Sequence, residues 1–197
     1  TFKIQNAPLL KTLLFPVLQQ VAENLTLEGN SQAKQLKNID FPVLKKVGGD
    51  LNISQWEAVE SIHLPMLESV IGFAISSMST AKSIVAPKLE TVHGTIRVVY
   101  CSALEEMNLT AVKNVAGALS LDRLGLTNLD GFKSIESLGK ELFLSDLKNL
   151  TDSKGLRSLK SVGERVYLST WPLLQDNMEG LKNLSHVGGD ITIYGIP

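Results

Sequence analysis

A short apolar sequence motif repeats along the chain roughly every 24 residues. The stretch "VGGDLNI" at Val47–Ile53 reappears as "VGGDITI" at Val187–Ile193, and similar phrases lie between them. Each begins with an apolar anchor residue, and successive anchors are 22 to 26 residues apart. The anchors are Val21, Val47, Val70, Val92, Val115, Leu138, Val162 and Val187. A repeat of this length predicts a solenoid, because one coil buries its apolar side chains only against its neighbours.

Two apolar residues follow each anchor, four and six positions later, as Leu51 and Ile53 do after Val47. Alternate residues of a strand point to the same face, so each pair predicts one strand per coil. Phe2 and Ile4 fit the same pattern one period earlier, which makes nine expected strands. The expected fold class is mainly β: a right-handed β-solenoid of about eight coils with a period of 22–26 residues, parallel sheets and few or no long helices.

The third coil departs from this register. Its expected inward positions hold Ala74 and Ser76, whereas the bulky residues are Phe73 and Ile75. A slip of one residue exchanges the two faces of a strand. We therefore expect a deletion or a bulge just before Phe73.

The segment before each anchor divides the chain into two parts. Phrases such as "LKNIDFPVLKKV" predict a second strand, here Ile39–Phe41, that ends at a proline. Coils six to eight instead carry Gly131, Gly155 and Gly180 seven residues before the anchor, which predicts a turn with positive φ. We expect one solenoid domain over residues 1–197, with the proline type in 1–127, the glycine type in 128–197, and short 3₁₀ turns. Both core ends would be uncapped, so we expect a fragment of a longer chain.

Composition disfavours several classes of function. The formal net charge is -1 and no basic run occurs, which argues against nucleic-acid and membrane-surface binding. No apolar stretch is long enough for a transmembrane segment. The single cysteine, Cys101, excludes an internal disulfide and is expected to be a buried hydrophobe.

The sequence also lacks a recognisable active site. It contains no G-x-S-x-G, phosphate-loop, dinucleotide-binding or H-E-x-x-H motif. His63, His93 and His186 occupy different places in their coils, so we expect no metal site. The carboxylate pair Glu105/Glu106 is interpreted as solvated surface. We expect no catalysis and no cofactor.

The repeat grammar, clearest in "VGGDLNI" and "LDGFKSIESLGKELFLSD", resembles the receptor L-domain group of leucine-rich-repeat-like solenoids. That group includes ectodomain modules of insulin- and EGF-type receptors, fungal wall-organisation surface proteins and surface lipoproteins of Bacteroides-type bacteria. One cysteine cannot supply the disulfides of the animal members, and the fungal members are usually richer in Ser and Thr. The resemblance therefore favours a bacterial surface protein, and it covers essentially the whole chain.

Five N-x-S/T triplets occur, which is more than composition predicts. In a eukaryotic protein they would mark N-glycosylation of a secreted chain. The alternative is that the repeat generates them, because three read N-L-T and one reads N-L-S, with leucine at a core position. The asparagines are Asn24, Asn52, Asn108, Asn149 and Asn183.

The outward side of the predicted long sheet holds the candidate ligand-binding residues. Large rings edged by charge suit recognition of a protein or a glycan. The alternative is that these side chains only stabilise the sheet, by packing against side chains of the neighbouring strands. Trp56 weakens the binding interpretation, since it occupies the same place in its coil as Trp171 and could merely cover a strand end. The candidates are Phe143, Tyr167, Glu141, Arg165, Asp190, Trp171 and Tyr194.

A second row stacks three cations on successive coils: Lys133, Arg157 and Lys182. Because like charges at this spacing repel, they must be solvated or paired. We interpret the row mainly as a polar face, with an anionic or acidic partner as the alternative.

We therefore predict a non-catalytic binding or adhesion module, located outside the cell or on its surface, whose partner is a protein or a glycan. The anchor to the surface would lie outside this segment. A structural spacer or wall-organising rod is one alternative, and a repeat segment of a larger enzyme is another. Self-association, end to end or lateral, is compatible with uncovered core ends.

Overall fold

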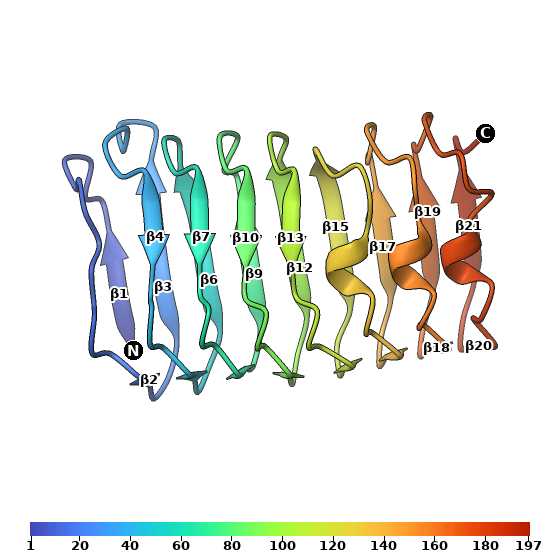
Figure 1. Cartoon of the computed structure of the whole chain (residues 1–197), viewed down its shortest axis with the longest axis horizontal. Helices are drawn as coiled ribbons and strands as arrows, with labels where there is room; N and C mark the ends of the chain where they lie inside the picture. Colours follow the sequence, from blue (N-terminus) through green and yellow to red (C-terminus); the bar gives the residue numbers. More distant parts are fainter.

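A computed structural model describes all 197 residues, and they form the predicted β-solenoid (Figure 1). The long sheet contains nine parallel strands, one per coil, as the apolar pairs predicted. In order they are β1 (Phe2–Gln5), β3 (Leu25–Asn30), β6 (Leu51–Trp56), β9 (Phe73–Ser76), β12 (Ile96–Cys101), β15 (Leu119–Leu124), β17 (Leu142–Ser145), β19 (Val166–Ser169) and β21 (Ile191–Tyr194).

The second strand of the early coils forms the short sheet, which has four parallel strands. They are β4 (Asn38–Asp40), β7 (Ser61–His63), β10 (Ser83–Val85) and β13 (Glu106–Asn108). In the later coils three 3₁₀ helices take the place of these strands: η1 (Asp130–Phe132), η2 (Lys154–Leu156) and η3 (Glu179–Leu181). Figure 1 shows the helices continuing the row of short strands toward the C-terminus.

The anchors form a third parallel sheet, the anchor sheet, which the sequence pattern did not predict. Each strand is only two residues long, too short to show a periodicity of its own. The strands are β2 (Gln20–Val21), β5 (Lys46–Val47), β8 (Ser69–Val70), β11 (Thr91–Val92), β14 (Asn114–Val115), β16 (Ser137–Leu138), β18 (Ser161–Val162) and β20 (His186–Val187).

The expected irregularity in the third coil is a one-residue deletion. Phe73 pairs with Leu51 on one side and with Ile96 on the other, so it occupies the inward row. It follows its anchor Val70 by three residues, whereas Leu51 follows Val47 by four. The shorter turn keeps the bulky side chains of Phe73 and Ile75 in the core, where both are fully buried.

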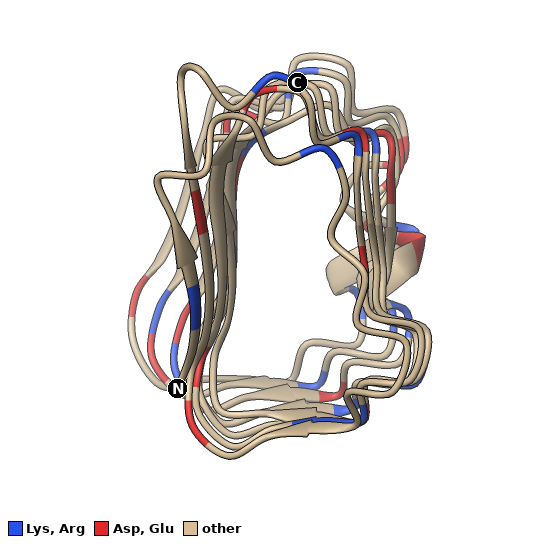
Figure 2. Cartoon of the chain, turned by 90° about the vertical axis from the view of Figure 1, so that its left-hand side faces the viewer, with Lys and Arg blue, Asp and Glu red and all other residues tan.

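The inward rows of the three sheets build one apolar column of 53 buried residues that runs from Leu13 to Leu174. Burying one leucine or isoleucine side chain contributes roughly 1.5–3 kcal/mol. The coils therefore stabilise one another mainly through this column. Charged positions lie around the outside of the tube, as Figure 2 shows in a view along the stack of coils.

The glycines of coils six to eight do not adopt the positive φ that we predicted. Among the glycines only Gly195 has a positive φ. Gly131, Gly155 and Gly180 lie inside the 3₁₀ helices, and a Cβ atom on them would lie 1.8–1.9 Å from a backbone carbonyl oxygen of the preceding coil. Glycine is required here because two backbones approach closely, and not because the chain turns.

Positive φ occurs instead at the end of the long strands, on residues that are not glycine. Gln55, Ser77, Tyr100, Arg123, Asp146 and Thr170 have φ between 53° and 59°. Such a residue breaks the alternation of a strand, so the next side chain points into the core. The residues that follow form an additional buried row, which includes Trp56, Met78, Cys101, Leu124, Leu147 and Trp171.

Cys101 belongs to this buried row, as predicted for a small hydrophobe. Desolvation raises the pKa of its thiol to about 11. Because only the thiolate is reactive, the folded protein holds Cys101 in an inert form.

Candidate binding face

The outward side of the long sheet carries the candidate residues in register. One row crosses β12, β15, β17 and β19 and contains Arg97, Ser120, Phe143 and Tyr167. The rings of Phe143 and Tyr167 stack with centroids 5.0 Å apart and an interplanar angle of 8°. Both residues are partly exposed. Each ring covers one face of the other, so each ring keeps one face that its partner does not cover.

An ion pair borders the aromatic pair where β17 and β19 begin. The Arg165 Nε atom donates to the Glu141 Oε2 atom at 2.6 Å. This hydrogen bond, together with the charge of Glu141, raises the pKa of Arg165. Arg165 remains 61% exposed, so the pair contributes little to stability but fixes a charge beside the rings. Asp190 lies one coil further along and is exposed.

Tyr194 and Trp171 differ in their placement. Tyr194 is 71% exposed on β21, next to the β19 strand that carries Tyr167. Trp171 is fully buried, so our assignment of Trp171 to the binding face is wrong. The positive φ of Thr170 turns the next side chain inward, as Gln55 does for the equally buried Trp56. The tryptophans belong to the core and cannot contact a ligand on this face.

The same bends place three residues on the face that the sequence did not single out. The Arg123 guanidinium lies 5.0 Å from the centroid of the Tyr100 ring. The Arg123 Nε atom also donates to the Asp146 Oδ2 atom at 3.3 Å. The nearby charge of Asp122, followed by those of Tyr100 and Asp146, raises the pKa of Arg123. The available signal was recurrence, because each of Tyr100, Arg123 and Asp146 follows its anchor by eight residues.

Two outward residues near the start of β15 are small. Ala118, just before the strand, is 6% exposed, and Ser120, within it, is 4% exposed. The Arg97 Nη1 atom donates to the Ser120 Oγ atom at 3.3 Å, so the guanidinium lies across this strand. We name the surface formed by Arg97, Phe143, Tyr167, Glu141 and Arg165 the aromatic strip.

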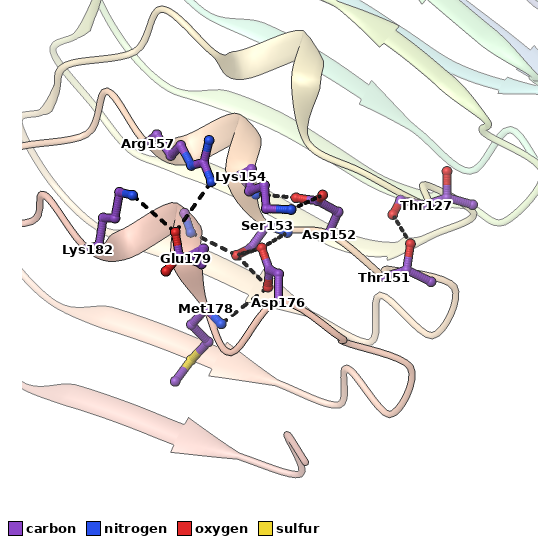
Figure 3. Close-up of polar contacts among 11 residues, drawn as sticks. Thr127, Thr151, Asp152, Ser153, Lys154, Arg157, Asp176, Met178, Glu179 and Lys182 are labelled. Carbon is purple, nitrogen blue, oxygen red and sulfur yellow. Dashed lines mark hydrogen bonds and ion pairs between the residues drawn. The ribbon is translucent and has the colours of Figure 1, made fainter.

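The residues of the cation row directly follow the three 3₁₀ helices, and the row is partly paired. The Glu179 Oε2 atom accepts from Arg157 Nη2 at 3.3 Å and from Lys182 Nζ at 3.1 Å (Figure 3). Lys133 forms no ion pair. One carboxylate thus bridges two of the three stacked cations, which accounts for their proximity without an external anion.

Four of the five sequon asparagines use their side chains within the fold. The Asn183 Nδ2 atom, for example, donates to the Arg157 carbonyl oxygen at 2.8 Å, and Asn24, Asn108 and Asn149 also form hydrogen bonds. Asn52 lies half-buried on the long sheet without such a bond. Four of these asparagine side chains thus form hydrogen bonds within the fold, which agrees with the interpretation that the repeat generates the triplets. Glycosylation stays a prediction.

No group of three or more His, Cys, Asp or Glu side chains is arranged to hold a metal ion. None of the helices has the length and apolar character that crossing a membrane requires.

Comparison with known proteins gives one partial likeness. The chain is 30% identical over 103 residues to the protein ecm33 of Aspergillus fumigatus, a fungal cell-wall surface protein. The match covers 52% of this chain and 25% of ecm33. No family model matches the chain, and no solved structure matches it. The chain is therefore a distant, partial homologue of a surface repeat protein, and the bacterial origin that we favoured gains no support.

Proposed function

We propose that the chain is a non-catalytic module of a cell-surface or wall-associated protein, and that it binds a partner protein through the aromatic strip. The observation that carries this proposal is the stacked pair Phe143 and Tyr167, two aromatic rings that lie partly exposed beside one another on the outward side of neighbouring strands. The surface location rests on the likeness to ecm33 and on the resemblance to receptor L domains.

The chemistry of the strip favours a protein over a glycan. A sugar that binds to an aromatic ring stacks on an open ring face, and Phe143 and Tyr167, with centroids 5.0 Å apart, each cover one face of the other. Arginine and aromatic residues are enriched where proteins meet, and Arg97, Arg123 and Arg165 lie on the same side of the long sheet as the pair. The carboxylates of Glu141 and Asp146 hold two of these arginines in place, which reduces the entropy lost on binding.

The test is a double variant, Phe143→Ala with Tyr167→Ala. Fluorescently labelled protein is titrated onto intact cells of the source organism and measured by flow cytometry. We expect at least about tenfold weaker binding, since truncating two central aromatic residues costs roughly 2 kcal/mol or more. Treating the cells with a protease should abolish binding of the wild-type chain, whereas glycosidase treatment should leave it.

The matched control is Thr26→Ala with Asn52→Ala, because these residues lie in the same outward row on β3 and β6. This variant should bind like the wild type. Equal binding by all three proteins would remove the aromatic strip as the site.

A structural rod is the second candidate, and one observation favours it. Ion pairs join neighbouring coils along the outside, for example Lys160 with Glu136 at 2.6 Å and Lys37 with Glu60 at 3.3 Å. Outward side chains that form ion pairs with the next coil stabilise the rod and need no external ligand. Concentration-dependent lateral association in sedimentation analysis, without binding to cells, would support this function over the first.

A further inference from the structure

A furrow runs along the outward side of the short sheet. A hollow of about 390 Å³ lies over β4, β7 and β10, and a second of about 230 Å³ lies over β13 and η1. Val85 lines the first hollow, and its in-register neighbour Asn108 lines the second. The two hollows thus lie next to one another along the stack of coils, and we name them together the furrow. The η1 helix stands where the short sheet ends (Figure 1).

The floor of the furrow offers hydrogen-bonding groups on every strand. Its two outward rows are Asn38, Ser61, Ser83 and Glu106, and Asp40, His63, Val85 and Asn108. The Ser61 hydroxyl donates to the Asn38 Oδ1 atom at 2.9 Å. The His63 Nδ1 atom lies 3.5 Å from the Asp40 Oδ1 atom. Val85 is the single apolar side chain of these rows, and they contain no Phe, Tyr or Trp.

These features of the furrow do not favour binding of a peptide. An added strand needs a free sheet edge. At one end of the short sheet Leu14 bridges to Asp40, and at the other the Leu109 N–H donates to the carbonyl oxygen of Gly131 in η1 at 3.0 Å. A helix or a loop would need apolar pockets for its anchor residues. Met107, Leu126 and Phe132 line the second hollow, but all three are buried and offer little apolar surface to an anchor.

An extended polysaccharide matches the same features. It presents hydroxyl groups along its whole length and needs no sheet edge. Neighbouring strands repeat at about 4.8 Å, close to the length of one hexose in an extended chain. Successive sugar units would therefore meet equivalent groups on successive coils.

The charge of the furrow restricts the kind of polysaccharide. Glu105, Glu106 and Asp130 line the hollow at η1, and Lys133 is the single cation beside them. Asp40 adds a carboxylate at the other end. An excess of carboxylates repels anionic polymers and tolerates neutral or amino sugars. We propose that the furrow over the short sheet binds an extended neutral or amino polysaccharide, with about one sugar unit per strand.

The long sheet and the short sheet lie on different sides of the tube (Figure 2), so the aromatic strip and the furrow are separate surfaces. The long sheet and the short sheet share a core but no outward residue. The two proposed sites are therefore independent. A module with both would join a wall polymer to a partner protein.

The experiment blocks the furrow with large side chains on its floor. Ser61→Trp with Ser83→Trp places two large side chains on neighbouring strands of the short sheet, where outward aromatic residues are compatible with a strand. The control, Ser54→Trp with Ser76→Trp, makes the same change on neighbouring strands of the long sheet. Circular dichroism melting checks that both variants fold.

The probes are insoluble β-1,3-glucan, chitin and chitosan, with alginate as the anionic polymer, followed by soluble oligosaccharides of the retained type in order of length. We expect the wild type to sediment with a neutral or amino polymer and not with alginate. Affinity should rise with oligosaccharide length up to about four units, one per strand. The furrow variant should bind at least about tenfold more weakly, and the control should bind like the wild type.

Absence of binding to every neutral and amino polymer would overturn the proposal. So would equal loss in the control, or affinity that does not depend on oligosaccharide length. The Phe143→Ala with Tyr167→Ala variant should keep full polysaccharide binding, so failure here is distinguishable from failure of the aromatic strip.

Discussion

Replacing Gly155 by alanine tests the close approach between coils seven and six. A Cβ atom on Gly155 would lie 1.9 Å from the Leu129 carbonyl oxygen and 2.0 Å from its carbonyl carbon. Both atoms belong to the backbone, so neither moves as a flexible side chain would. Overpacking costs about 1–3 kcal/mol, and a contact between two backbones falls at the upper end. The entropic gain of Gly→Ala, roughly 0.4–1 kcal/mol, offsets part of it.

The expected net loss is about 2 kcal/mol, which corresponds to a Tm about 4–8 °C lower for a domain of this size. Calorimetry on the two proteins measures it directly. Gly72→Ala is the matched control, because its Cβ would meet only the movable carboxylate Oδ1 of Asp50 at 2.7 Å. That variant should change Tm by no more than about 2 °C.

A second substitution separates close approach from a left-handed turn. Asparagine tolerates positive φ better than most residues. If Gly155 were needed for a left-handed turn, Gly155→Asn should leave Tm nearly unchanged. If Gly155 is needed because two backbones approach closely, Gly155→Asn should lower Tm at least as much as Gly155→Ala does. A Gly155→Asn protein with wild-type Tm would refute the steric explanation.

Four further outcomes are expected. Ser153→Ala should lower the free energy of unfolding in urea by about 1–3 kcal/mol, because the buried Ser153 hydroxyl donates to the Asp176 Oδ2 atom at 2.8 Å and accepts from the Gly180 N–H at 3.0 Å (Figure 3). Trp171→Ala should cost about 3–5 kcal/mol in the same assay, and a loss below 1 kcal/mol or so would contradict its burial in the core. Cys101, with its pKa raised to about 11 by burial, should react with Ellman's reagent at neutral pH only after unfolding. The hydrogen bond from Lys160 lowers the pKa of Glu136 below the ordinary glutamate pKa of 4.5. The wild type should therefore be more stable than Glu136→Gln above pH 4.5, and this difference should vanish as the pH falls through the lowered pKa.

Much of the fold follows from periodicity alone. Apolar pairs such as Leu51 and Ile53 fix which residues face the core, and their regular return fixes parallel pairing between coils. Even the slip at Phe73 is visible, because moving a bulky residue by one position would bury Ala74 in its place. The stacked pair of the aromatic strip follows from the same register, since Phe143 and Tyr167 are opposite one another on neighbouring strands.

The remaining features depend on backbone conformation that residue type does not reveal. Gln55 and Thr170 adopt positive φ without being glycine, so the inward turn of Trp56 and Trp171 could not be foreseen. The role of Gly155 depends on the distance to the next coil, which no local pattern contains. The furrow likewise lies over the short sheet and η1, and a sequence pattern carries no information about the depth of a surface.

The most direct test of the stacked register is a distance series by pulsed electron paramagnetic resonance. Spin labels are placed in one outward row, with one label at Thr26 and the second at Arg97, Phe143 or Thr192, in a Cys101→Ser background. These positions are three, five and seven strands from β3, so the backbone separations should be about 14, 24 and 34 Å at about 4.8 Å per strand. Distances that rise in this linear way would support both proposed surfaces. A non-linear series, or Thr192 lying as close to Thr26 as Arg97 does, would contradict the stacking of the coils on which both surfaces depend.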